Sequence, residues 1–129
     1  MKNIEVEIQA RTEDLGKAKE ALGKVGEFVK TRKQIDKYFV PPGRDFFAKN
    51  PPDEYLRIRH EEGADHLNYS FLHFGEDASL HSTDEYETSV GKPEVAETIF
   101  EKAGLILAVT VQKTRMYFNC GDFEATLDQ

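Results

Sequence analysis

Charged residues of one sign recur at every second position in four segments of the chain. Two segments are acidic and two are basic: Glu5-Val-Glu7, Glu85-Tyr-Glu87, Arg57-Ile-Arg59 and Lys113-Thr-Arg115. In an extended strand, residues i and i+2 lie on one face about 6.5–7 Å apart, so each segment places two like charges on one surface. Like charges at this spacing repel each other. We therefore expect the acidic and basic pairs to face one another, or to face a ligand such as a metal ion or a phosphate group.

The composition predicts a single soluble domain and argues against several classes of function. A chain of 129 residues, of which 39% are hydrophobic and 32% charged, can bury one core. The net charge of −7 argues against binding to a nucleic acid polymer, because no basic surplus can neutralise a phosphate backbone. A single cysteine, Cys120, excludes an internal disulfide and a cysteine metal cluster. Because no apolar run could span a bilayer and no signal-peptide core opens the chain, we expect a cytoplasmic protein without a membrane partner.

Hydrophobic periodicity predicts a chain of strands interrupted by two short helices. The expected strands cover residues 3–11, 28–40, 55–61, 66–74, 84–90, 106–118 and 122–128. Thr12 is the expected N-cap of the first helix, Pro93 lies in the first turn of the second, and Gly26 and Gly104 follow the helices. The apolar faces of the two helices consist of Leu15, Ala18, Leu22 and Val25, and of Val95, Ile99 and Ala103.

The number of strands and their short connections favour an α+β fold in which an antiparallel sheet curves into a barrel or tunnel with flanking helices. The apolar strand faces would pack beneath the helices, and the charged faces would line a water-filled interior. The alternative is an open sheet whose charged faces meet the solvent. The segregation of charge sign by strand favours the interior, because solvated faces usually mix signs.

Six segments of the sequence, taken in order, resemble the CYTH family and in particular its class IV adenylyl cyclase branch. They are Glu5-Val-Glu7-Ile-Gln9, the stretch QIDKYFVPPGRDF at 34–46, Leu56-Arg57-Ile-Arg59, Glu85-Tyr-Glu87, Lys113-Thr-Arg115-Met-Tyr117 and Leu127-Asp128. The resemblance covers residues 1–129 as a single domain. It implies a triphosphate tunnel, an antiparallel barrel that binds a triphosphate group with basic residues and one or two Mg²⁺ or Mn²⁺ ions with acidic residues.

The resemblance also implies which residues contact the ligands. The implied phosphate contacts are Arg57, Arg59, Lys113 and Arg115, and the implied metal ligands are Glu5, Glu7, Glu85, Glu87 and Asp128. Guanidinium groups bind phosphates bidentately, and carboxylates are the hard oxygen ligands that Mg²⁺ prefers. No catalytic residue is assigned, since a hydrolase would position a water and a cyclase would position a ribose hydroxyl.

We expect metal-dependent hydrolysis or cyclisation of inorganic triphosphate, thiamine triphosphate or ATP. The alternative is a degenerate, non-catalytic module that binds polyphosphate or a nucleotide, since Gln9, Ser70 and Thr83 stand where the family has cations. A third alternative is a structural homodimer with a vestigial tunnel. Family members continue beyond the position of Gln129 into a final strand. We therefore expect a domain truncated at its C-terminus, or a missing strand supplied by a second chain. The four histidines lack metal-ligand spacing and are expected in strands or at the surface.

Overall fold

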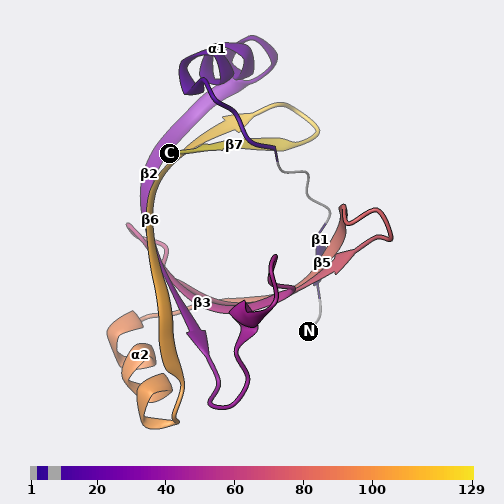
Figure 1. The fold of residues 1–129 in the computed structure, drawn as a ribbon. Helices are drawn as coiled ribbons and strands as arrows, with labels where there is room; N and C mark the ends of the chain where they lie inside the picture. The colour runs from indigo at the N-terminus through magenta and orange to yellow at the C-terminus, as the bar shows by residue number, and fades with distance from the viewer. Residues whose placement is uncertain (1–2, 6–9) are drawn as a thin grey trace. The chain divides into compact units, whose positions relative to one another are not determined.

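The computed structural model describes the backbone of residues 3–5 and the backbone and side chains of residues 10–129. These residues form seven strands, two α-helices and one short 3-10 helix (Figure 1). Their order is β1 (Asn3–Glu5), α1 (Leu15–Val25), β2 (Glu27–Val40), η1 (Phe46–Ala48), β3 (Glu54–Glu61), β4 (His66–Phe74), β5 (Leu80–Ser89), α2 (Pro93–Lys102), β6 (Ile106–Asn119) and β7 (Glu124–Asp128). The mixture of strands and two helices expected from the sequence is confirmed.

The described strands form one sheet in the order β1-β5-β4-β3-β2-β6-β7. The pairs β1–β5, β3–β4, β4–β5 and β6–β7 are antiparallel. The chain divides into two compact units, of which unit 1 contains residues 1–8 and 35–111 and unit 2 contains residues 9–34 and 112–129. The long strands β2 and β6 contribute residues to both units.

The sheet of unit 1 has a polar face and a face that α2 covers. Directly opposite residues of antiparallel strands share a face, and Arg57 lies opposite Asn68, which in turn lies opposite Glu87. Ile58, the next residue of β3, therefore points to the other face, where it is fully buried. On that face α2 packs against β3 (Figure 1). The alternation predicted for this strand is thus present.

The helix α2 is rotated relative to the expectation from its sequence. Val95 and Ile99 were expected to form the packed face, but their side chains are 47% and 60% exposed. The ring of Phe100 instead packs edge-to-face on Phe39 of β2, with 5.2 Å between ring centroids. Glu97, on the same side, reaches charged partners on the sheet. The large ring and the charged contacts outweigh the burial of the smaller aliphatic side chains.

Unit 2 joins α1 to the β6–β7 hairpin. Asp14, rather than Thr12, is the N-cap of α1, because its Oδ1 accepts a hydrogen bond of 3.0 Å from the backbone N–H of Lys17. Thr12 accepts instead from the backbone N–H of Asp14. The helix ends before Gly26, where a Cβ atom would lie 2.5 Å from the Sγ of Cys120, so a close approach to the hairpin requires glycine.

Several strand boundaries also differ from the expectation. Ala10 and Arg11 lie outside β1, and residues 6–9 are outside the described part of the chain. The strand β5 begins at Leu80 rather than residue 84, because its pairing with β4 continues past an irregularity between His73 and Phe74. The strand β7 begins at Glu124 because residues 120–123 form the preceding turn. Neither of the described helices has the length and apolar character needed to cross a bilayer.

We expect Phe39→Ala to destabilise the protein strongly. Phe39 is 1% exposed, and truncation of a buried phenylalanine costs about 3–5 kcal/mol because it leaves a cavity. Urea denaturation would measure the change in the free energy of unfolding. Phe123→Ala is the control, since Phe123 is 61% exposed and its truncation should cost less than about 1 kcal/mol. Equal losses in the two variants would contradict this assignment of the core.

Candidate functional site

Most of the buried side chains in the described part of the chain are polar. Among the described residues, six hydrophobic side chains are buried, whereas eight polar or charged ones are: Gln34, Asp36, Arg57, Arg59, Glu61, Asn68, Ser70 and Thr83. All of these except Gln34 belong to unit 1. The register and the strand alternation place the buried polar residues of β3, β4 and β5 on one face of the sheet of unit 1. Asp36 of β2 reaches that face through its ion pair with Arg59. Because burying polar groups is costly unless they are hydrogen-bonded, this face is the candidate functional site.

A bidentate ion pair joins β2 to β3 on the polar face. The Nε and Nη2 atoms of Arg59 donate hydrogen bonds of 2.7 and 2.8 Å to the two carboxylate oxygens of Asp36. The side chain of Asp36 is fully buried and that of Arg59 is 11% exposed. Two parallel bonds of this kind hold the guanidinium in one orientation. Arg59, an expected phosphate contact, therefore already has a carboxylate partner.

Arg57, the other arginine of β3, is held differently. It is 8% exposed, and its Nε is buried without a hydrogen-bond partner among the described residues. Its guanidinium lies 5.6 Å from the centre of the Tyr55 ring. A buried donor without a partner costs about 1–3 kcal/mol. An anion beside Arg57 would remove this cost, which makes Arg57 the strongest candidate for a phosphate contact in unit 1.

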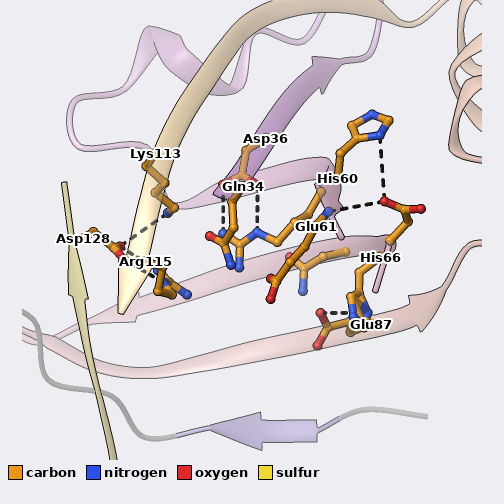
Figure 2. A network of polar contacts seen from close by, with 12 residues as sticks. Gln34, Asp36, His60, Glu61, His66, Glu87, Lys113, Arg115 and Asp128 are labelled. Carbon is orange, nitrogen blue, oxygen red and sulfur yellow. Dashed lines mark hydrogen bonds and ion pairs between the residues drawn. The ribbon is translucent and has the colours of Figure 1, made fainter. Parts of the chain in front are cut away.

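Glu85 and Glu87 lie on the same face of β5, as expected from their spacing. The Nδ2 of Asn68 donates a hydrogen bond of 2.7 Å to the Oε1 of Glu85, and the Oγ of Ser70 donates one of 2.9 Å to the Oδ1 of Asn68. Glu87 instead lies beside His66, with 3.6 Å between its Oε1 and the ring Nδ1 (Figure 2). The two carboxylates thus have different neighbours.

The donors of this face fit a hard divalent cation only in part. Carboxylates are suitable ligands, and Mg²⁺ often binds through one or two carboxylates together with water and substrate phosphates. Within the side chains that the structure describes, no three His, Cys, Asp or Glu groups converge as a metal site. The backbone of Glu5 lies opposite Thr83, but its side chain and the whole of Glu7 are outside the described residues. Of the expected metal ligands, the structure therefore describes the side chains of Glu85 and Glu87 in unit 1 and of Asp128 in unit 2.

Unit 2 brings together three further expected site residues. Arg115 and Asp128 lie opposite each other, and the Nε and Nη2 of Arg115 donate hydrogen bonds of 2.6 and 2.7 Å to the two oxygens of Asp128 (Figure 2). The Nζ of Lys113 lies 3.5 Å from the Oδ2 of Asp128. Burial alone would raise the pKa of Asp128, but Arg115 and Lys113 outweigh it and lower that pKa below its ordinary value of 3.8. Asp128 is thus an ionised partner of two cations.

A second charged cluster lies on the opposite face of unit 1, where α2 packs. Glu97 of α2 accepts a hydrogen bond of 3.0 Å from the Nζ of Lys37 and contacts the Nε2 of His60 at 2.8 Å. Burial alone would raise the pKa of Glu97, but the hydrogen bonds with His60 and Lys37 outweigh it and lower that pKa below its ordinary value of 4.5. This cluster attaches α2 to β2 and β3.

The loop before β3 is also tied down by charge. Arg44 pairs with Glu54 at 2.9 Å rather than with its neighbour Asp45, which caps η1 by accepting from the backbone N–H of Phe47. The hydroxyl of Tyr69 donates to Glu54 at 2.5 Å, and burial together with this carboxylate raises the pKa of Tyr69 to about 12. These contacts fix the loop to β3 and β4.

Sequence reasoning found the charged pairs but missed their partners. Asp36 and Asn68 were not among the expected site residues, although Gln34 and Asp36, like Asn68 and Ser70, follow the same two-residue period as the charged pairs. Of the expected phosphate contacts, Arg57 and Arg59 belong to unit 1, and Lys113 and Arg115 to unit 2. The convergence of all four on one anion stays a prediction.

Comparison with known proteins identifies the family. The whole chain, residues 1–129, matches the CYTH domain. The chain belongs to the CYTH family. A protein of Methanocaldococcus jannaschii named "Putative adenylate cyclase MJ0240" is 34% identical over 126 residues, which are 97% of this chain and 69% of that protein.

Solved structures show the same fold at lower sequence identity. The PH1012 protein of Pyrococcus horikoshii is 23% identical with a TM-score of 0.67, and the match covers 99% of this CYTH chain and 70% of that one. The Hippeastrum protein HpAC1, to which a dominant triphosphatase activity is ascribed, is 16% identical with a TM-score of 0.69, covering 99% and 72% of the two chains. The expected CYTH-type fold is confirmed by these similarities.

We expect the pairing of Asp128 to make stability depend on pH in the acid range. Because the native pKa of Asp128 is lowered, its contribution is complete above 3.8 and is lost as the pH falls through the lower native value. Asp128→Asn should therefore reduce the fall in melting temperature below about pH 4. The side chain is 36% exposed, so the contribution is at most about 1 kcal/mol. Identical acid melting profiles of variant and wild type would contradict this.

We expect Arg59→Ala to destabilise the protein more than Arg57→Ala. The first change removes the bidentate partner of the fully buried Asp36, which costs about 3–5 kcal/mol. The second removes a guanidinium whose Nε has no partner among the described residues. Chemical denaturation of both variants would measure the difference. The double variant Asp36→Ala/Arg59→Ala should recover part of the loss, and a purely additive double variant would refute a direct coupling.

Proposed function

We propose that this CYTH protein binds a triphosphate compound together with Mg²⁺ or Mn²⁺ and hydrolyses or cyclises it. The observation that carries the proposal is Arg57, a buried arginine whose Nε has no hydrogen-bond partner among the described residues. It lies on the same face of the sheet as Glu85 and Glu87. Two carboxylates on the same face as an arginine with an unsatisfied Nε are suited to an anion that arrives with a divalent metal.

The described residues would make different contributions to ligand binding. Arg57 would donate to phosphoryl oxygens, which satisfies its buried Nε. Arg59, held by Asp36, would add positive charge in a fixed direction. Glu85 and Glu87 would hold the metal ion, which when bound neutralises phosphate charge and lowers the pKa of a coordinated water or hydroxyl. Catalysis of phosphoryl transfer consists chiefly of such positioning and charge neutralisation.

The similar proteins support a triphosphate ligand, and three triphosphate compounds should be assayed as substrates. MJ0240 carries the name "Putative adenylate cyclase", and a dominant triphosphatase activity is ascribed to HpAC1, so both descriptions refer to chemistry on a triphosphate chain. Inorganic triphosphate, thiamine triphosphate and ATP share that chain. Release of phosphate from each, with Mg²⁺ and with Mn²⁺, distinguishes hydrolysis. Formation of a cyclic nucleotide from ATP distinguishes cyclisation.

A non-catalytic binding module is the second candidate, and specific contacts favour it. Arg59 and Arg115, two of the expected phosphate contacts, are each held bidentately by a carboxylate. Ser70 and Thr83 are buried and uncharged. These features reduce the positive charge available for a transition state. Tight metal-dependent binding of tripolyphosphate without turnover of any of the three compounds would establish this candidate.

We expect Arg57→Ala to weaken binding of tripolyphosphate in the presence of Mg²⁺. A hydrogen bond to a charged group contributes about 1.5–3 kcal/mol, which corresponds to a loss of affinity of about 10- to 150-fold. Isothermal titration calorimetry would measure it. Arg44→Ala is the matched control, because Arg44 is 63% exposed, pairs with Glu54 and should leave the affinity unchanged. Unaltered affinity in Arg57→Ala would show that Arg57 does not contact the ligand.

A further inference from the structure

We propose that Asn68 and Ser70 are positioning residues that hold Glu85 ready for a divalent cation. The inference rests on the metal-binding part of the proposed function and assigns roles to two residues that do not themselves contact the ion. Asn68 lies at the centre of the polar face, directly between Arg57 of β3 and Glu87 of β5. Its amide reaches past its direct neighbour Glu87 to the diagonal neighbour Glu85.

Ser70, Asn68 and Glu85 form a chain of two hydrogen bonds, which we call the relay. The donor and acceptor groups of these side chains determine the direction of each bond. The Nδ2 of Asn68 donates to the Oε1 of Glu85, because an amide NH₂ group can only donate. The carbonyl oxygen of the amide then faces Ser70, whose hydroxyl must donate. Ser70 therefore donates to Asn68 in a hydrogen bond of 2.9 Å, and Asn68 donates to Glu85 in one of 2.7 Å. An amide rotated by half a turn would place two acceptors together at Glu85.

The burial of the relay explains why it can orient the carboxylate. Asn68 and Ser70 are 0% and 1% exposed, whereas Glu85 is half-buried. A buried amide with both of its polar atoms hydrogen-bonded has little freedom to rotate. Its hydrogen bond therefore restricts the orientation of the more exposed carboxylate of Glu85. The Oε1 of Glu85 is occupied by Asn68, and Oε2 is not part of this bond. Glu85 would therefore bind a cation chiefly through one oxygen.

The relay holds the carboxylate without adding positive charge. A lysine in this place would repel an incoming cation, whereas the amide of Asn68 is a neutral donor. Removal of a residue that hydrogen-bonds a metal ligand without contacting the ion typically lowers metal affinity about 10- to 100-fold. Asn68 is suited to this role because it hydrogen-bonds Glu85, and Ser70 is suited to it because it hydrogen-bonds Asn68.

The test measures binding of Mn²⁺ alone, without any phosphate compound, by electron paramagnetic resonance. Asn68→Leu keeps the approximate shape of the side chain but cannot donate, and we expect it to lower Mn²⁺ affinity about 10- to 100-fold. Ser70→Ala keeps the amide and should cause a smaller loss in the same direction. Asn119→Ala is the matched control, since Asn119 is the last residue of β6 in unit 2, where its Oδ1 accepts from the backbone N–H of Gly121.

A double-mutant cycle separates positioning from a merely structural role. If Asn68 acts through Glu85, Asn68→Leu should cause no further loss of Mn²⁺ affinity in a Glu85→Gln background. Additive losses would overturn the inference, and so would a wild-type affinity in the folded Asn68→Leu protein. If Asn68→Leu does not fold, Ser70→Ala decides, and unchanged Mn²⁺ affinity in that variant refutes the relay. A wild type that binds no Mn²⁺ would overturn the metal-binding part of the proposed function as well.

Discussion

The ion pair of Arg59 and Asp36 makes the burial of charged side chains on the polar face of unit 1 possible. Removing two charges from water costs several kcal/mol for each ion, and this cost is offset only when geometry and further hydrogen bonds are favourable. The two short bonds of this pair meet the geometric requirement. They allow a charged guanidinium to remain on a face where most side chains are hidden from solvent. The neighbouring positions can then carry polar groups instead of an apolar core.

The arginines of this protein differ in how much of their binding capacity is already used. Arg59 and Arg115 each engage both oxygens of a carboxylate, so an incoming anion must share them with Asp36 or Asp128. Arg57 keeps a buried Nε without a hydrogen-bond partner in the described part of the chain. An anion therefore gains most at Arg57 and less at the paired arginines. A similar division holds for the acids, since Glu85 is oriented by an amide while Glu87 lies exposed beside a histidine.

Period-two alternation predicted which residues share a face, because strand geometry fixes that relation whatever the strand pairs with. Arg57, Glu85 and Glu87 were assigned to one polar face from the sequence, and the register of β3, β4 and β5 places them there. The partner of Arg59 could not be predicted, because it depends on contact between strands that are far apart in sequence. For the same reason helical periodicity gave the apolar stripe of α2 but not its orientation, which Phe100 and Glu97 determine through contacts with the sheet.

The two charged clusters that join β2 to β3 involve consecutive residues in each strand. Asp36 meets Arg59 on the polar face, and the next residues, Lys37 and His60, meet Glu97 on the face of α2. If β2 slipped by one residue, its side chains would exchange faces. A slip in one direction would bring Lys37 to the place of Asp36, opposite Arg59. A slip in the other direction would bring Asp36 to the place of Lys37, opposite Glu97. Like charges would meet in either case, so the arrangement penalises misaligned pairing of β2 in both directions.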